Sequence, residues 1–147
     1  MTSAVPLASM FLAKLDLITG FVKYSSAGHP PAFLLRANGE LEKLSEGGLL
    51  LGVLPDASYV SGSFELRAGD VLMFYSDGII ESRNSGEEEF GYERLEKQLR
   101  RAQNDSAGST GSADTMLFSV LGAVQDFAAT RSLMDDMSLV IVRRDGR

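Results

Sequence analysis

Two acidic positions beside apolar segments of this 147-residue sequence could bind a metal ion together. Asp77 follows the apolar run Val71–Tyr75 and precedes Gly78, and the pair Asp135-Asp136 precedes a second apolar run. A carboxylate at the end of a buried strand is well placed as a metal ligand, and carboxylate oxygens suit magnesium or manganese. Because a bound divalent ion polarises phosphoryl oxygens and activates water, this pattern indicates metal-assisted hydrolysis.

Each acidic position also has a simpler interpretation. Asp-Gly is a leading signal for a hairpin turn, so Asp77 and Gly78 could close a turn without binding an ion. Asp135 or Asp136 could cap a loop. Two carboxylates alone would also hold a hard cation weakly, because such ions keep most of their waters. Spacing alone leaves both alternatives open.

The composition is that of one acidic globular domain. Hydrophobic residues make up 44% of the chain and charged residues 23%, with a net charge of −6 that disfavours nucleic acid or an anionic membrane as partner. The absence of cysteine excludes disulfides and thiolate nucleophiles. No run approaches the roughly 18 apolar residues of a membrane span, and the N-terminus lacks the basic region of a signal peptide. We therefore expect a cytoplasmic protein with no membrane association in this segment.

The predicted elements are many strands, then two helices, then one strand, an order typical of an α+β protein. The unbroken apolar run Val71–Tyr75 predicts a strand buried on both faces, and Asn38-Gly39 is the sharpest hairpin signal. Asp114 is the expected N-cap of the second helix. Strands are predicted at 10–17, 21–26, 32–36, 40–44, 59–66, 71–75 and 137–142, a short helical turn at 79–81, and helices at 91–103 and 114–129.

Four sequence blocks carry a resemblance to a known family. Each block is weak by itself, but the four occur in the family's order and cover nearly the whole chain. They read YSSAGHPP at 24–31, GLLLGV at 48–53, GDVLMFYSDG at 69–78 and DDMSLVIV at 135–142. In these blocks the chain resembles the SpoIIE-type protein serine phosphatases, which are bacterial members of the PPM superfamily of metal-dependent phosphatases.

The resemblance implies an αββα four-layer sandwich with a two-metal site at one edge. It implies that Asp77 and Asp135 are metal ligands that act in catalysis through Mn²⁺ or Mg²⁺. Asp136 stands where the superfamily often has asparagine, so the resemblance places it behind the ligands, turned toward backbone amides. The implied reaction is hydrolysis of phosphoserine or phosphothreonine on a protein, such as an anti-sigma-factor antagonist.

One part of the family pattern has no counterpart here. The family's N-terminal portion carries a Gly-Asp whose acid bridges the two metals, and residues 1–147 contain no such block. We therefore expect a single, N-terminally truncated domain with a partial αββα sandwich, at most a partial metal site and no activity by itself. The alternative is a non-catalytic interaction module, or an inactive fragment that keeps the family's surface. Uncovered sheet edges predict self-association.

His29, the only histidine, is expected to be a turn residue, because the family's general-acid histidine belongs to the absent portion.

Overall fold

The computed structural model describes residues 4–106, 112–129 and 136–146, which form eight strands and three helices. The α+β class predicted from the sequence is confirmed. None of the helices in these ranges is long and apolar enough to span a membrane. The strands are β1 (Met10–Leu15), β2 (Phe21–Ala27), β3 (Ala32–Leu35), β4 (Leu41–Leu44), β5 (Gly47–Gly48), β6 (Gly62–Glu65), β7 (Val71–Tyr75) and β8 (Leu139–Arg143), and the helices are α1 (Asp77–Ile80), α2 (Gly91–Asp105) and α3 (Ala113–Ala128).

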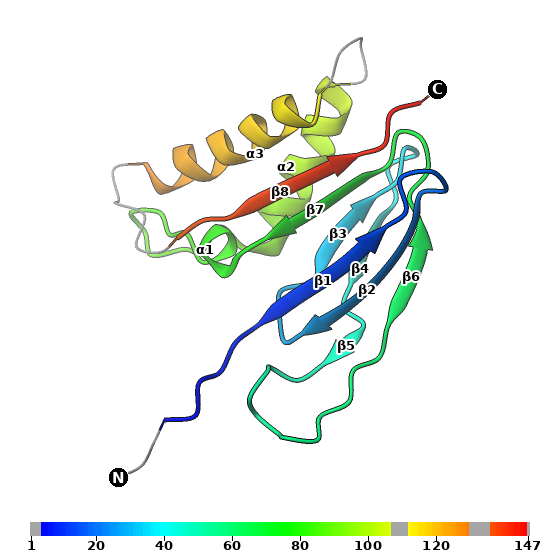
Figure 1. The fold of residues 1–147 in the computed structure, drawn as a ribbon. Coiled ribbons are helices and arrows are strands. Elements are labelled where there is room, and N and C mark those ends of the chain that lie inside the picture. The colour runs from blue at the N-terminus through cyan, green and yellow to red at the C-terminus, as the bar shows by residue number, and fades with distance from the viewer. Residues whose placement is uncertain (1–3, 107–111, 130–135, 147) are drawn as a thin grey trace.

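The strands form two sheets that pack face to face. In the first sheet, β2 pairs with β1 along one edge and with β5 and β6 along the other. The second sheet has the order β4-β3-β7-β8 and is antiparallel throughout. Helices α2 and α3 lie together on the outer face of the second sheet (Figure 1). The described part of the chain is therefore a helix–sheet–sheet arrangement, which agrees with a partial αββα sandwich.

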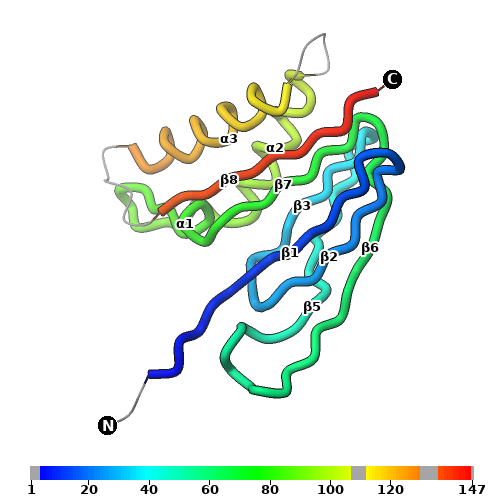
Figure 2. The backbone as a smooth tube through the Cα atoms, viewed as in Figure 1, coloured from blue at the N-terminus to red at the C-terminus, as the bar shows by residue number. Residues whose placement is uncertain are grey.

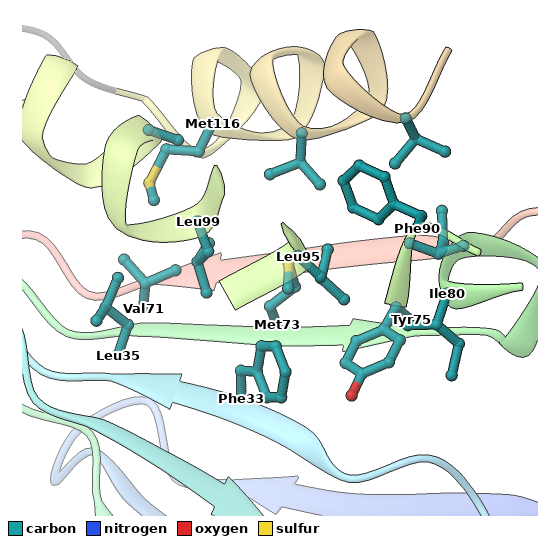
Figure 3. Packing of buried hydrophobic residues seen from close by; sticks show 14 residues of the cluster. Phe33, Leu35, Val71, Met73, Tyr75, Ile80, Phe90, Leu95, Leu99 and Met116 are labelled. Atoms are coloured by element: carbon teal, nitrogen blue, oxygen red, sulfur yellow. The ribbon is translucent and has the colours of Figure 1, made fainter. Parts of the chain in front are cut away.

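Strand β7 lies at the centre of the hydrophobic core because both of its faces are covered. Met73 and Tyr75 face the helices, whereas Leu72 and Phe74 contact the first sheet. Figure 3 shows the helix side of this core, where side chains of β3 and β7 meet those of α2 and α3. The unbroken apolar run thus predicts the bounds and the two-sided burial of this strand correctly.

Several local features differ from the sequence-based expectation. The strand predicted at 59–66 is limited to Gly62–Glu65, and the helical turn predicted at 79–81 spans Asp77–Ile80. The N-cap of α3 is Ser112, whose Oγ accepts a hydrogen bond from the Thr115 amide at 3.3 Å, so the prediction of Asp114 is wrong. Serine and aspartate cap helices about equally well, and the apolar stripe of the helix does not distinguish between them. The short strand β5, which pairs in parallel with β2, is not predicted by the hydrophobic pattern.

A buried polar network fixes the end of β7 that lies opposite Asp77. The side chain of Asp70 is 3% exposed and pairs with the Arg36 guanidinium at 2.8 Å. Its carboxylate also accepts hydrogen bonds from the backbone amides of Ala37 and Arg67, each at 2.9 Å. A buried carboxylate is tolerated only when it is paired and hydrogen-bonded in this way. Asp70 therefore ties the β3–β4 turn to the turn that precedes β7.

We predict that Asp70→Ala lowers the free energy of unfolding by about 3 kcal/mol or more, because it leaves Arg36 without its buried partner and two amides without an acceptor. Glu42→Ala is the matched control, since it removes the exposed partner of the same Arg36 and costs about 1 kcal/mol or less. Urea unfolding followed by circular dichroism measures both changes. Equal losses in the two variants would contradict this role for Asp70.

Candidate metal centre

Asp77 is the first residue of α1 and directly continues the end of β7. Its side chain is exposed, whereas Gly78 behind it is buried. The Glu81 amide donates to the Asp77 carbonyl at 2.9 Å, which closes the helical turn. Asp77 and Gly78 therefore begin a short helix, and the hairpin-turn interpretation of this dipeptide is wrong. The alternative in which a buried strand delivers an acid to the sheet edge agrees with this geometry.

Gly78 is required because another backbone segment passes close to it. A Cβ atom at this position would lie 2.3 Å from the carbonyl oxygen of Asp136. Gly78 is not among the glycines with positive φ, so its helical backbone would accept any residue. The need for glycine at this position therefore comes from the close approach of the Asp136 backbone and not from an unusual backbone conformation.

Ser76 holds the same two segments together through three hydrogen bonds. Its amide donates to the Ser138 carbonyl at 3.0 Å, and its Oγ accepts from the Ser138 amide at 2.8 Å. The Ser76 hydroxyl also lies 3.4 Å from the Asp136 carbonyl, to which it donates. Because β7 and β8 are antiparallel neighbours, these contacts bring Asp77 and Asp136 to one edge of the second sheet. Sequence reasoning missed Ser76 and Ser138, since a serine at a strand end carries no distinctive signal.

The predicted ligand set is only partly located by the structure. Asp77 and Asp136 are both exposed at this edge. Asp135 lies outside the described residues, so its proximity to Asp77 stays a prediction, as does the orientation of the Asp136 carboxylate toward backbone amides. Within the part of the chain that is described, no three histidine, aspartate or glutamate side chains are grouped as metal ligands.

Two tyrosines lie close enough to Asp77 to respond to its charge. Burial raises the pKa of the Tyr75 phenol; repulsion from Tyr92, once that phenol ionises, and from the charge of Asp77 raises it further. Burial likewise raises the pKa of Tyr92, with additional contributions from Asp77 and Glu81. The Tyr75 hydroxyl has no hydrogen-bond partner among the described residues, and in Figure 3 it points away from α3. Both phenols are therefore neutral at physiological pH and add no charge to the acidic edge.

His29 lies in the turn between β2 and β3, as predicted. Its amide is 3.3 Å from the Ser26 hydroxyl, to which it donates, and its Nδ1 is 3.1 Å from the Pro30 carbonyl. The ring packs edge-on against Phe11, with the two centroids 6.3 Å apart. His29 is therefore a turn residue whose ring packs against β1.

We predict that Tyr75→Phe keeps or slightly raises the free energy of unfolding, because it removes a buried hydroxyl that makes no hydrogen bond. The folded-state pKa of Tyr75 is raised, so its contribution to stability is fully present below the unfolded-state pKa of about 10 and is lost as pH rises above it. The variant should consequently lose less stability between about pH 9 and pH 11 than the wild type, with Tyr92→Phe as comparison. A loss larger than 2 kcal/mol at neutral pH, roughly that of breaking a hydrogen bond, would show that the hydroxyl is partnered.

We predict that Gly78→Ala costs about 1–3 kcal/mol, because the added methyl group must displace the Asp136 segment. Gly122→Ala is a matched control in α3, where a Cβ would meet nothing within 4 Å and should stabilise the chain by about 0.5–1 kcal/mol. Thermal and urea unfolding of both variants measure the contrast. A neutral Gly78→Ala would mean that the two segments do not pack closely in solution.

Comparison with known proteins identifies the family to which this geometry belongs. The chain matches the model of the family described as stage II sporulation protein E (SpoIIE) over residues 2–145. It is 28% identical to phosphoserine phosphatase RsbU of Bacillus subtilis, over 92% of this chain and 38% of that protein. It is also 32% identical to protein IcfG of Synechocystis sp., over 63% of this chain and 14% of that protein. The chain thus spans only part of the length of these relatives.

Solved structures agree with this assignment at the level of the fold. The phosphatase domain of SpoIIE from Bacillus subtilis superposes with a TM-score of 0.68 at 22% identity, covering 95% of this chain and 57% of that one. The SiaA-PP2C domain of Pseudomonas aeruginosa gives a TM-score of 0.74 at 15% identity, covering 93% and 51%. The chain therefore belongs to the SpoIIE family and shares the fold of the PP2C-type (PPM) phosphatase domains.

Proposed function

We propose that this chain forms part of a metal-dependent phosphatase centre that hydrolyses phosphoserine or phosphothreonine on a protein. Asp77 and Asp135 are the proposed ligands, and Asp136 supports them from the adjacent backbone. The observation that carries the proposal is the packing of the Asp136 segment on Gly78, which brings two acidic segments far apart in the sequence to one sheet edge.

Relatives of the chain support this type of chemistry. RsbU is named a phosphoserine phosphatase, the SpoIIE phosphatase domain was studied after soaking in manganese, and RsbX was solved in complex with magnesium. These statements concern those proteins. For this chain they favour a phosphoprotein substrate, such as an anti-sigma-factor antagonist, and Mn²⁺ or Mg²⁺ as the metal.

The donor chemistry at the edge fits a hard divalent cation. The exposed Asp77 carboxylate offers oxygen ligands, which Mg²⁺ and Mn²⁺ prefer, and such ions commonly keep several waters when few protein ligands are available. When bound, a divalent ion polarises the phosphoryl oxygens and lowers the pKa of a coordinated water. With so few acids at the described edge, we expect binding in the millimolar range.

The remaining residues of the edge position the acids. Ser76 joins the end of β7 to the start of β8, and Gly78 allows the Asp136 segment to approach without a gap. Tyr75 is buried in the core two residues before Asp77, and its raised pKa keeps the phenol neutral, so it adds no negative charge to the edge. This arrangement can hold an ion next to a phosphoryl group of a partner protein that docks at the edge.

Turnover should require more of the domain than these 147 residues supply. The chain covers 57% of the solved SpoIIE phosphatase domain, and the resemblance assigns the metal-bridging acid to a portion with no counterpart here. Misplacement of a reacting group by an ångström alone can cost about a hundredfold in rate, so loss of a bridging ligand costs several orders of magnitude. If the chain also fails to bind metal, the alternative of a non-catalytic interaction module is favoured.

We predict that the chain binds Mn²⁺ weakly and that Asp77→Asn abolishes this binding. Asp114→Asn is the matched control, because it removes the same charge from an exposed position at the first turn of α3. Titration calorimetry and the electron paramagnetic resonance of free Mn²⁺ give two independent measures of the bound ion. Equal binding by Asp77→Asn and wild type would show that the edge is not the metal centre.

We also predict no phosphate release from a phosphoserine protein substrate above background by this chain alone. A longer protein that adds the family's N-terminal portion should show manganese-dependent release, and Asp77→Asn in that protein should lower it by about a hundredfold or more. Phosphate release with and without manganese on both proteins measures the difference. Robust metal-dependent release from residues 1–147 alone would overturn the expected need for a further segment.

A further inference from the structure

Lys43 is an exposed cationic residue that the candidate metal centre does not use. It lies on β4, and its ammonium nitrogen sits over the rings of Phe33 and Tyr92, 5.9 Å and 5.8 Å from their centroids. Attraction to the faces of aromatic rings holds an ammonium group in place. Lys43 takes part in none of the ion pairs between described residues. Its charge is therefore positioned by the fold while its solvent side is open to an anion.

The ring of Tyr92 connects Lys43 to the acidic edge. Tyr92 packs edge-on against the buried Tyr75, with the two ring centroids 6.4 Å apart. Burial and then the charges of Asp77 and Glu81 raise the pKa of the Tyr92 phenol, so both carboxylates lie near this ring. Helix α1, which begins at Asp77, lies beside α2, which carries Tyr92 (Figure 2). One cation and two acids thus lie around a single aromatic side chain.

The sheet register gives the separation between Lys43 and the candidate metal centre. In the order β4-β3-β7, Lys43 and Met73 are both partners of Phe33, so they are level with each other across two strand spacings. With strands about 4.8 Å apart and a rise of about 3.4 Å per residue, Lys43 lies roughly 12 Å from Tyr75 at the end of β7. An extended peptide spans this distance in roughly three or four residues.

The other cations near this edge are already neutralised. Arg83 and Arg94 form ion pairs with the glutamates of the acidic loop at 87–89. An acidic edge repels an acidic polypeptide, so a fixed and open cation beside it favours the substrate whose own acid faces that cation. Lys43 is the described residue near the edge that offers such a cation.

We infer that Lys43 binds an acidic side chain of the phosphoprotein, roughly three or four residues from the phosphoserine. This inference rests on the proposed function, because it takes the phosphoserine to lie at Asp77. The contact sets which substrate is preferred and adds little affinity, since an exposed ion pair changes binding by about two- to fivefold. The aliphatic stem of Lys43 has a separate packing role, because it covers the rings beneath it.

Two synthetic phosphoserine peptides test this contact. They differ only at the third and fourth positions on either side of the phosphoserine, which carry aspartate in one peptide and asparagine in the other. Shifts of the backbone amide resonances of the chain, measured with millimolar peptide and millimolar Mg²⁺, give the two dissociation constants. We expect the aspartate peptide to bind about threefold more tightly and to shift the amides of Lys43 and Tyr92 more than the asparagine peptide does.

Substitutions at Lys43 separate its charge from its packing. Lys43→Met keeps the aliphatic stem and removes the charge, so it should bind the two peptides equally. Lys43→Arg keeps the charge and should keep the preference, whereas Lys43→Glu should prefer a peptide with lysine at the same positions. Lys97→Met is the matched control, because it removes the same charge from an exposed position of α2 and should leave the preference unchanged. Urea unfolding of each variant detects any loss of packing.

Equal binding of the two peptides by the wild type, or no binding of either, would overturn the inference. A preference that survives in Lys43→Met or disappears in Lys97→Met would also overturn it. Repeating the titrations in EDTA distinguishes this inference from the proposed function. Metal-dependent binding without a preference that depends on Lys43 contradicts the inference alone. A preference that depends on Lys43 and is the same in Mg²⁺ and EDTA supports the contact and contradicts the metal centre.

Discussion

The contact between Gly78 and the backbone of Asp136 is the constraint on which the candidate site depends. A side chain as small as a methyl group at Gly78 would lie 2.3 Å from the Asp136 carbonyl, so the two segments can approach only with glycine at this position. Ser76 then fixes their relative position through its hydrogen bonds to Ser138. Two acids distant in the sequence reach one sheet edge because β7 and β8 are antiparallel neighbours that both end there.

The two ends of β7 show opposite treatments of a carboxylate. At one end, Asp70 is buried, paired with Arg36 and hydrogen-bonded to two amides. Its carboxylate therefore joins two turns. At the other end, Asp77 is exposed, and the nearby tyrosines are neutral. The first environment stabilises the fold and offers nothing to a ligand, whereas the second leaves carboxylate oxygens accessible to a cation.

Much of the fold could be predicted because its strongest signals are local. The run Val71–Tyr75 predicts β7 residue for residue, and Asn38-Gly39 marks the turn between β3 and β4. The site was less predictable, because Asp-Gly is compatible both with a hairpin turn and with an acid at the end of a buried strand. Only the contact with the Asp136 segment distinguishes the two. The close approach of Asp136, the bridge through Ser76 and the buried ion pair of Asp70 all join residues far apart in sequence, and such contacts leave no periodic trace. The family resemblance supplied Asp135 as a ligand, which lies outside the described residues.

Paramagnetic broadening of amide resonances by Mn²⁺ tests the central claim most directly, because it reports where on the chain the ion binds. As Mn²⁺ is added in small amounts, the amides of Asp77, Gly78 and Ser138 should broaden first, and the acidic loop at 87–89 should respond only at higher concentrations. Its three glutamates already form ion pairs with Arg83 and Arg94. Broadening that begins at this loop, or that spreads evenly over the surface, would contradict a metal centre at the end of β7.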